Sequence, residues 1–112
     1  MNTKPQQRLE KGYLLIDHKK QTKISIQEII YLQGDINYTN FIFRNRRQIT
    51  ISHSLKYFEE ALLKNGFLRI HRSHIVNSKF IKTTNLDEMM VVLMDGRELK
   101  VARRRVKMLD NM

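Results

Sequence analysis

Short apolar runs, separated by polar turns roughly every ten residues, constrain the fold of this chain more than any other feature of its sequence. Runs of about four to eight residues between Gly, Asn or Asp are typical of strands, whereas a helix shows a longer repeat with a different period. Helical spacing is clear in one segment only. The sequence therefore predicts a mainly β domain with one amphipathic helix.

Most of the expected strands pair as hairpins. Polar residues at 18–22 separate the first two strands, Gly34 and Asp35 are expected to end the third, and Asp95-Gly96 is a strong turn signal between the last two. Residues 74–81 carry no pattern that assigns them. The expected strands cover 13–16, 23–26, 29–32, 38–44, 48–52, 67–71, 89–94 and 98–102.

The helix is expected at about 55–64. Its apolar side chains share one face at helical spacing and predict a contact with the core: Leu55, Phe58, Ala61 and Leu62. Ser54 is well placed as the N-cap and Gly66 as the C-terminal stop. Residues 103–109 are expected to form a short C-terminal helical turn.

The length of 112 residues accommodates one domain. Residues 1–11 are polar and include the only proline, so they are predicted to be a tail or linker, with the domain at 12–112. No apolar run approaches the roughly 18 residues of a transmembrane helix, and the N-terminus lacks the apolar core of a signal peptide. We expect a cytoplasmic protein without a membrane partner.

The charge balance indicates a polyanionic partner. The chain has 21 Lys and Arg against 11 Asp and Glu, a net charge of +10, which suits nucleic acid or an anionic membrane surface. Between Phe67 and Thr84 there is no acid, and the basic residues are Arg69, Arg72, Lys79 and Lys82. The six basic residues from Arg97 onward face only Glu98 and Asp110. Such stretches fit phosphate neutralisation, although each alone could be a solvated basic face.

Catalytic chemistry has little support. Cysteine is absent, which excludes disulfides, thiolate catalysis and cysteine-based metal sites. Among the histidines, His18, His53, His71 and His74, only the last two are close, and one His-x-x-His without a carboxylate neighbour is a weak metal signal. The acidic pairs at 59–60 and 87–88 fall on the polar side of the helix and in a loop. We predict no enzyme activity, no metal site and no cofactor.

Side chains that can read base edges gather in three predicted loops. Arg matches guanine, Asn matches adenine, and Thr offers a hydroxyl and a methyl group. These residue types occur at 37–40, at 71–72 and at 103–105. For Tyr38 and Asn77, a structural role in the core or in a turn is as well supported as a role in reading bases. This placement suits a β domain that inserts loops, not a recognition helix, into the grooves of DNA.

Three blocks in this order resemble the LytTR family of bacterial DNA-binding domains: YLQGDINYTNFIF at 31–43, FLRIHRSHIVN at 67–77 and DGRELKVARRRVKML at 95–109. The resemblance covers roughly residues 12–112. It implies small antiparallel β-sheets packed in layers, and loops that enter two successive major grooves and the minor groove between them. Family members vary at the positions of Thr39 and Arg72, so the target sequence cannot be carried over.

The resemblance implies sequence-specific binding to duplex DNA by a transcriptional regulator, of the type that serves as the output of a response regulator in a two-component system. It implicates Thr39, Arg72 and Arg104 in particular. The candidate DNA-binding residues are Asn37, Tyr38, Thr39, Asn40, His71, Arg72, Ser73, Lys100, Arg103, Arg104, Arg105 and Lys107. We further expect a second protomer on paired direct repeats, and a receiver or sensor partner that this chain does not encode.

A basic module for RNA or an anionic surface is the alternative. Against it, the chain has no aromatic-rich strand of the kind that stacks RNA bases and no strongly basic amphipathic helix. A small hydrolase would need a cluster of acids that the sequence lacks. The operator, the regulated genes, the input signal, the oligomeric state off DNA and the choice between a stand-alone regulator and a fragment stay open.

Overall fold

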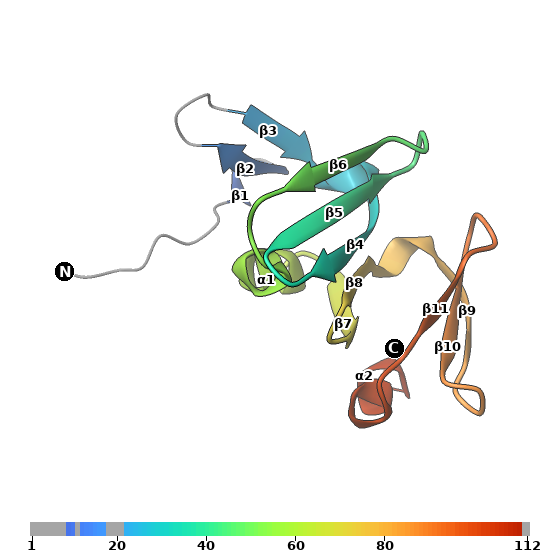
Figure 1. Ribbon diagram of the computed structural model, residues 1–112. Helices are drawn as coiled ribbons and strands as arrows, with labels where there is room; N and C mark the ends of the chain where they lie inside the picture. The colour runs from blue at the N-terminus through green and yellow to red at the C-terminus, as the bar shows by residue number, and fades with distance from the viewer. Residues whose placement is uncertain (1–8, 11, 18–21, 111–112) are drawn as a thin grey trace.

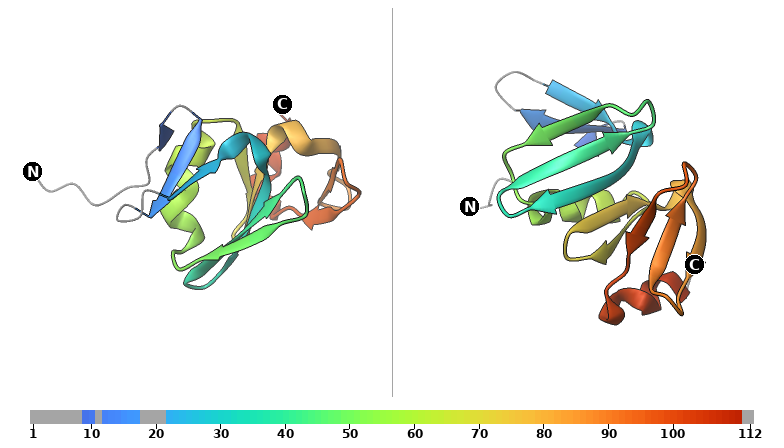
Figure 2. Two further views of the ribbon diagram at one scale, coloured as in Figure 1. Left: turned by 90° about the horizontal axis from the view of Figure 1, so that it is seen from above. Right: turned by 45° about the vertical axis from the view of Figure 1, so that its right-hand side comes forward.

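The computed structural model describes residues 9–10, 12–17 and 22–110. Within these residues the strands form three antiparallel sheets, and the prediction of a mainly β fold is confirmed (Figure 1). The two outer sheets lie on opposite sides of a central sheet (Figure 2).

The central sheet has five strands in the order β6-β5-β4-β8-β7. Every neighbouring pair is antiparallel. The strands predicted at 38–44 and 48–52 form β5 and β6 and pair with each other as a hairpin. The strands are β4 (Ile29–Asp35), β5 (Tyr38–Phe43), β6 (Gln48–Ile51), β7 (Phe67–His71) and β8 (His74–Asn77).

The outer sheets have three strands each. The first contains β1 (Leu9–Glu10), β2 (Tyr13–Asp17) and β3 (Thr22–Ser25), in that order, and the second contains β9 (Ile81–Asn85), β10 (Met90–Leu93) and β11 (Glu98–Lys100), in the order β11-β10-β9. The hairpin predicted from Asp95-Gly96 is confirmed, since Gly96 adopts a φ of +92° and the Leu93 amide donates to the Arg97 carbonyl. Within the segment predicted to be a tail or linker, Leu9–Glu10 forms a strand that pairs with Tyr13 and Leu14.

The main helix, α1 (Leu55–Leu63), agrees with the predicted range, and Gly66 follows it with a φ of +86°. Ser54 occupies the N-cap position, but its side chain makes no capping hydrogen bond. The predicted C-terminal turn is present as a 3-10 turn and a short helix. The remaining helical elements are η1 (Ile26–Glu28), η2 (Ser78–Phe80), η3 (Arg103–Arg105) and α2 (Val106–Asp110).

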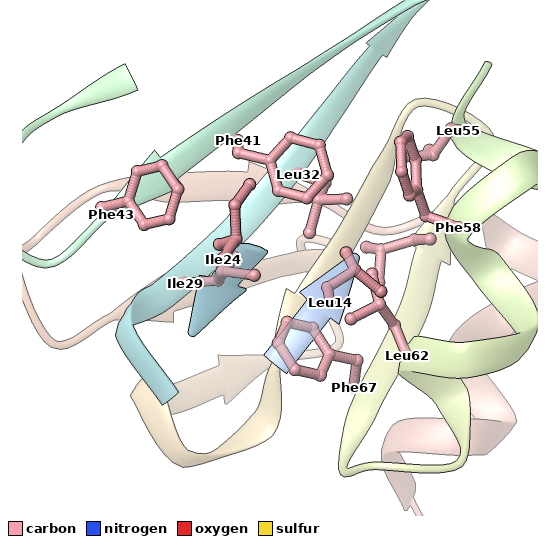
Figure 3. Packing of buried hydrophobic residues seen from close by; sticks show 11 residues of the cluster. Leu14, Ile24, Ile29, Leu32, Phe41, Phe43, Leu55, Phe58, Leu62 and Phe67 are labelled. Carbon is pink, nitrogen blue, oxygen red and sulfur yellow. The ribbon is translucent and has the colours of Figure 1, made fainter. Parts of the chain in front are cut away.

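Two hydrophobic clusters cover the two faces of the central sheet. Helix α1 and the first outer sheet pack on one face, where Phe58 of the helix makes an edge-to-face contact with Phe41 of β5 at 4.9 Å between ring centroids (Figure 3). The second outer sheet and α2 pack on the other face through Val91, Leu93 and Leu109. Burial of both faces explains why the strands of the centre read as apolar runs with little alternation.

The prediction that Gly34 and Asp35 end a strand is wrong. Both residues belong to β4, and the turn comes two residues later, at Ile36 and Asn37. A β-carbon at Gly34 would lie 3.0 Å from the β-carbon of Leu55. The glycine is therefore needed because α1 approaches the strand closely, not because the chain turns there.

Residues 74–81, which the sequence left unassigned, form β8, η2 and the start of β9. Asn77 is buried where β8 passes into η2. Its amide nitrogen donates to the carbonyl of Ile29 at 3.0 Å, and its side-chain oxygen accepts from the amide of Lys79 at 3.2 Å. Of the two roles left open for Asn77, the structure assigns the structural one.

Candidate nucleic-acid interface

One end of the central sheet collects three connections. Because the five strands alternate in direction, the β4–β5 turn, the β6–α1 loop (52–54) and the β7–β8 turn must all lie at the same end. The Gly34 amide donates to the Ser73 carbonyl at 2.8 Å and joins the first turn to the third. In Figure 1 this end faces the lower side of the molecule.

The β4–β5 turn projects past its neighbours. Pairing with β8 stops at Gln33 and pairing with β6 stops at Thr39, whereas Asp35 and Tyr38 form one more rung beyond them. Tyr38 is 52% exposed, so of the two roles left open for it the core role is excluded. The candidate residue Asn37 is also exposed on this turn.

The predicted contact residue Thr39 is fully buried in this structure, so its side chain faces the interior of the fold. Its hydroxyl donates to the carbonyl of His53 at 2.8 Å, so Thr39 holds the β6–α1 loop against the turn. The exposed His53 ring in that loop stacks on Tyr57, with ring centroids 4.0 Å apart. Asn40 is half-buried and accepts a hydrogen bond from Thr50 at 2.6 Å.

The β7–β8 turn presents Arg72 to solvent and is supported by Arg69 from behind. The Arg69 guanidinium donates to the carbonyls of His71 and Arg72 and forms an ion pair with Glu59 of α1 at 2.6 Å. Ser73 completes the turn, because its amide donates to Nδ1 of His71 at 3.1 Å. Arg69 therefore does not belong to the free basic patch expected from the sequence, since its charge is used inside the fold.

Burial and neighbouring groups lower the pKa of both histidines of this turn. Burial lowers the pKa of His71, and the charges of Arg72, Lys100, Arg105 and Arg69 lower it further. Burial also lowers the pKa of His74, whose ring lies 5.5 Å from that of His71. Across the described ranges, no three His, Asp or Glu side chains are grouped so as to hold a metal ion.

The C-terminal segment lies beside the β7–β8 turn. The Ala102 amide donates to the Ile70 carbonyl at 2.7 Å, which fixes the start of η3 against β7. Arg105 is half-buried, its guanidinium approaches the Arg69 carbonyl at 3.4 Å, and burial lowers its pKa. The exposed candidates of this segment are Lys100, Arg103, Arg104 and Lys107.

The structure also separates residues that the sequence grouped together. Lys79 and Lys82 follow Asn77, at the opposite end of β8 from Arg72. Lys79 lies over the ring of Phe80, 5.3 Å from its centroid. Sequence reasoning missed the supporting role of Arg69 and Glu59, because it depends on a contact between β7 and α1 that no local pattern encodes.

In the described part of the chain, no helix has the length and apolar character needed to span a membrane.

The chain is similar to known DNA-binding domains and transcriptional regulators. A family model described as the LytTr DNA-binding domain matches residues 19–112. The heme-containing CO-sensing transcriptional regulators RcoM 1 and RcoM 2 of Paraburkholderia xenovorans (strain LB400) are each 34% identical over 76 residues. The aligned part is 67% of this chain but only 28% of each relative.

A solved LytTr DNA-binding domain from Bacillus cereus has a similar fold. Its TM-score is 0.74 at 23% sequence identity, and the match covers 91% of this chain and 96% of that one. At this identity the likeness concerns the fold.

Proposed function

The chain belongs to the LytTR family of DNA-binding domains, and from this premise we propose that it binds duplex DNA sequence-specifically as part of a bacterial transcriptional regulator in the cytoplasm. The β4–β5 and β7–β8 turns and the η3 segment contact the grooves, and the surrounding lysines contact phosphates. The observation that carries the proposal is the placement of two turns and a basic segment around one end of the central sheet.

Two kinds of contact are expected in this surface. Arg72 and Arg104 are exposed on short turns, and a guanidinium can donate two hydrogen bonds to guanine in the major groove. Lys100 and Lys107 are exposed as single positive charges and suit phosphate contacts, which give affinity without sequence preference. This division between base contacts and phosphate contacts explains why the chain has a high net charge although few of its residues contact base edges.

The experiment begins with selection of preferred sites from a random duplex pool. Binding to the selected duplex, a scrambled duplex, single-stranded RNA and anionic vesicles is then titrated at two salt concentrations. A chain that neutralises several phosphates should show a log-log salt slope of about −0.9 per phosphate contacted. Equal affinity for scrambled DNA, RNA or vesicles would refute sequence-specific DNA binding.

Variants separate the two kinds of contact. Arg104→Ala should weaken binding to the selected duplex by about 1–3 kcal/mol and change binding to scrambled DNA little, whereas Lys107→Ala should weaken both and reduce the salt slope by about one. If Arg104→Ala leaves the ratio of selected to scrambled affinity unchanged, Arg104 contacts phosphate and the reading residues lie in the two turns.

RcoM 1 and RcoM 2 are named as transcriptional regulators. We propose that this chain also takes part in regulating transcription. We further propose that two protomers bind together to paired direct repeats in the DNA. The origin of the signal, through a receiver or another sensor, stays a prediction.

A further inference from the structure

Ile36, at the tip of the β4–β5 turn, is the least expected residue of the exposed surface. It is 85% exposed, and its φ of +53° lies in the left-handed region. Branched side chains are strongly disfavoured there, and Gly or Asn are the usual residues at such a position. The turn would form more readily with either of them.

Packing within the domain gives no compensation for this choice. A side chain exposed to this degree removes little apolar surface from water, so Ile36 contributes little to the stability of the folded state. A strained backbone that persists at an exposed position is a reason to look for a role in binding.

Strand pairing and packing support the turn from behind. Asp35 and Tyr38 extend the β4–β5 ribbon one rung past the flanking strands. Behind the tip, the Gly34 amide donates a hydrogen bond to the Ser73 carbonyl at 2.8 Å, and Gly34 packs against Leu55. A two-stranded ribbon of this kind fits the major groove of B-form DNA.

The chemistry of the tip differs from that of the other two DNA-facing segments. From Gln33 to Asn40 there is no lysine or arginine, and the exposed Asp35 would repel phosphates. Phosphate neutralisation is therefore left to the β7–β8 turn and the C-terminal segment. A tip with an apolar end and flanking polar groups is suited to base edges instead.

We propose that Ile36 is a specificity-determining residue that contacts the 5-methyl group of a thymine in the major groove. That methyl group is the apolar feature of the major-groove edge of the base pairs. The inference rests on the proposed function, because it requires this end of the sheet to face DNA.

The test uses the selected duplex and replaces its thymines one at a time by deoxyuridine, which lacks the methyl group. The unmodified chain should lose about fourfold in affinity at one thymine, the change expected for one buried methyl group. The variant Ile36→Asn should bind the thymine and deoxyuridine duplexes equally. Urea unfolding should show Ile36→Asn to be at least as stable as the parent, since asparagine tolerates the left-handed conformation.

Met94→Asn is the matched control. Met94 is 59% exposed and belongs to the β10–β11 turn, which lies away from the β4–β5 and β7–β8 turns (Figure 1). This variant should therefore keep the dependence on the thymine methyl group. The inference would be overturned if no thymine of the selected duplex lost affinity on replacement by deoxyuridine, or if Ile36→Asn lost as much affinity as the parent. In either case, selective binding of the selected duplex by the parent would leave the proposed function intact. If the parent does not distinguish selected from scrambled DNA, the proposed function fails, and the inference with it.

Discussion

Removal of the ion pair between Arg69 and Glu59 should destabilise the domain much more than removal of an ordinary surface pair. The two side chains are only 12% and 27% exposed, and their charged atoms are 2.6 Å apart. Arg69 also donates to the carbonyls of His71 and Arg72. Removing it therefore leaves an acid without its partner and two carbonyl groups without their donors.

We expect Arg69→Met to lower the free energy of unfolding by about 3 kcal/mol, and Glu59→Gln by about 1 kcal/mol, between the values for exposed and for fully buried pairs. The double variant should lose about 3 kcal/mol, because the interaction between the two residues can be lost only once. The coupling energy is then about 1 kcal/mol.

Urea denaturation of the parent, both single variants and the double variant gives this cycle. The exposed pair of Glu60 and Lys64 on the same helix, with charged atoms 3.4 Å apart, is the control, and Glu60→Gln should change stability by less than about 0.5 kcal/mol. Additive effects of Arg69→Met and Glu59→Gln would refute coupling through the ion pair. A loss below about 1 kcal/mol for Arg69→Met would show that the turn does not depend on its support.

Three further results are expected. Phe58→Ala should lower the free energy of unfolding by about 3–5 kcal/mol, because Phe58 is fully buried. DNA binding should decline only in proportion to the unfolded fraction, measured by circular dichroism. A stable variant that fails to bind DNA would contradict the assignment of this face of α1 to the core. Burial lowers the pKa of His74 in the folded state, so below about pH 6.5 the unfolded state binds more protons than the folded state. The free energy of unfolding should therefore fall as the pH drops from about 6.5. Urea titrations at several pH values should show a weaker pH dependence for His74→Gln. On a promoter with two half-sites, an insertion of about 5 bp should abolish paired occupancy in footprinting, because half a helical turn places the sites on opposite faces of the DNA.

The strand pattern and the helix were predictable because they depend on local signals. Leu55, Phe58 and Leu62 share a face that needs no knowledge of the rest of the chain, and the Asp95-Gly96 turn is encoded by its own two residues. Gly34 was misread because its function is to accommodate Leu55, which lies 21 positions later in the sequence. The same residue type serves in turns and at close contacts, and only the fold distinguishes them.

The candidate interface was predictable as a set of segments but not residue by residue. Family resemblance indicated Thr39, yet a threonine near a strand end can point outward or bond inward, and here its partner is the His53 carbonyl. Arg69 was counted as free charge because Glu59 lies on another element. Charge composition therefore predicts the type of partner, while the division between contact and support requires the tertiary contacts.

The hydrogen bond between the Gly34 amide and the Ser73 carbonyl has an evolutionary consequence. It joins the β4–β5 and β7–β8 turns through main-chain atoms, so the distance between them does not depend on the side chains at their tips. Substitutions at positions such as 36 and 72 can accumulate without moving either turn. An inserted residue in β4 or β8 would instead exchange the two faces of the strand beyond it. Under the proposed function, a change of operator would therefore require only substitutions at the tips of the turns, whereas an insertion within β4 or β8 would disrupt the sheet that carries them.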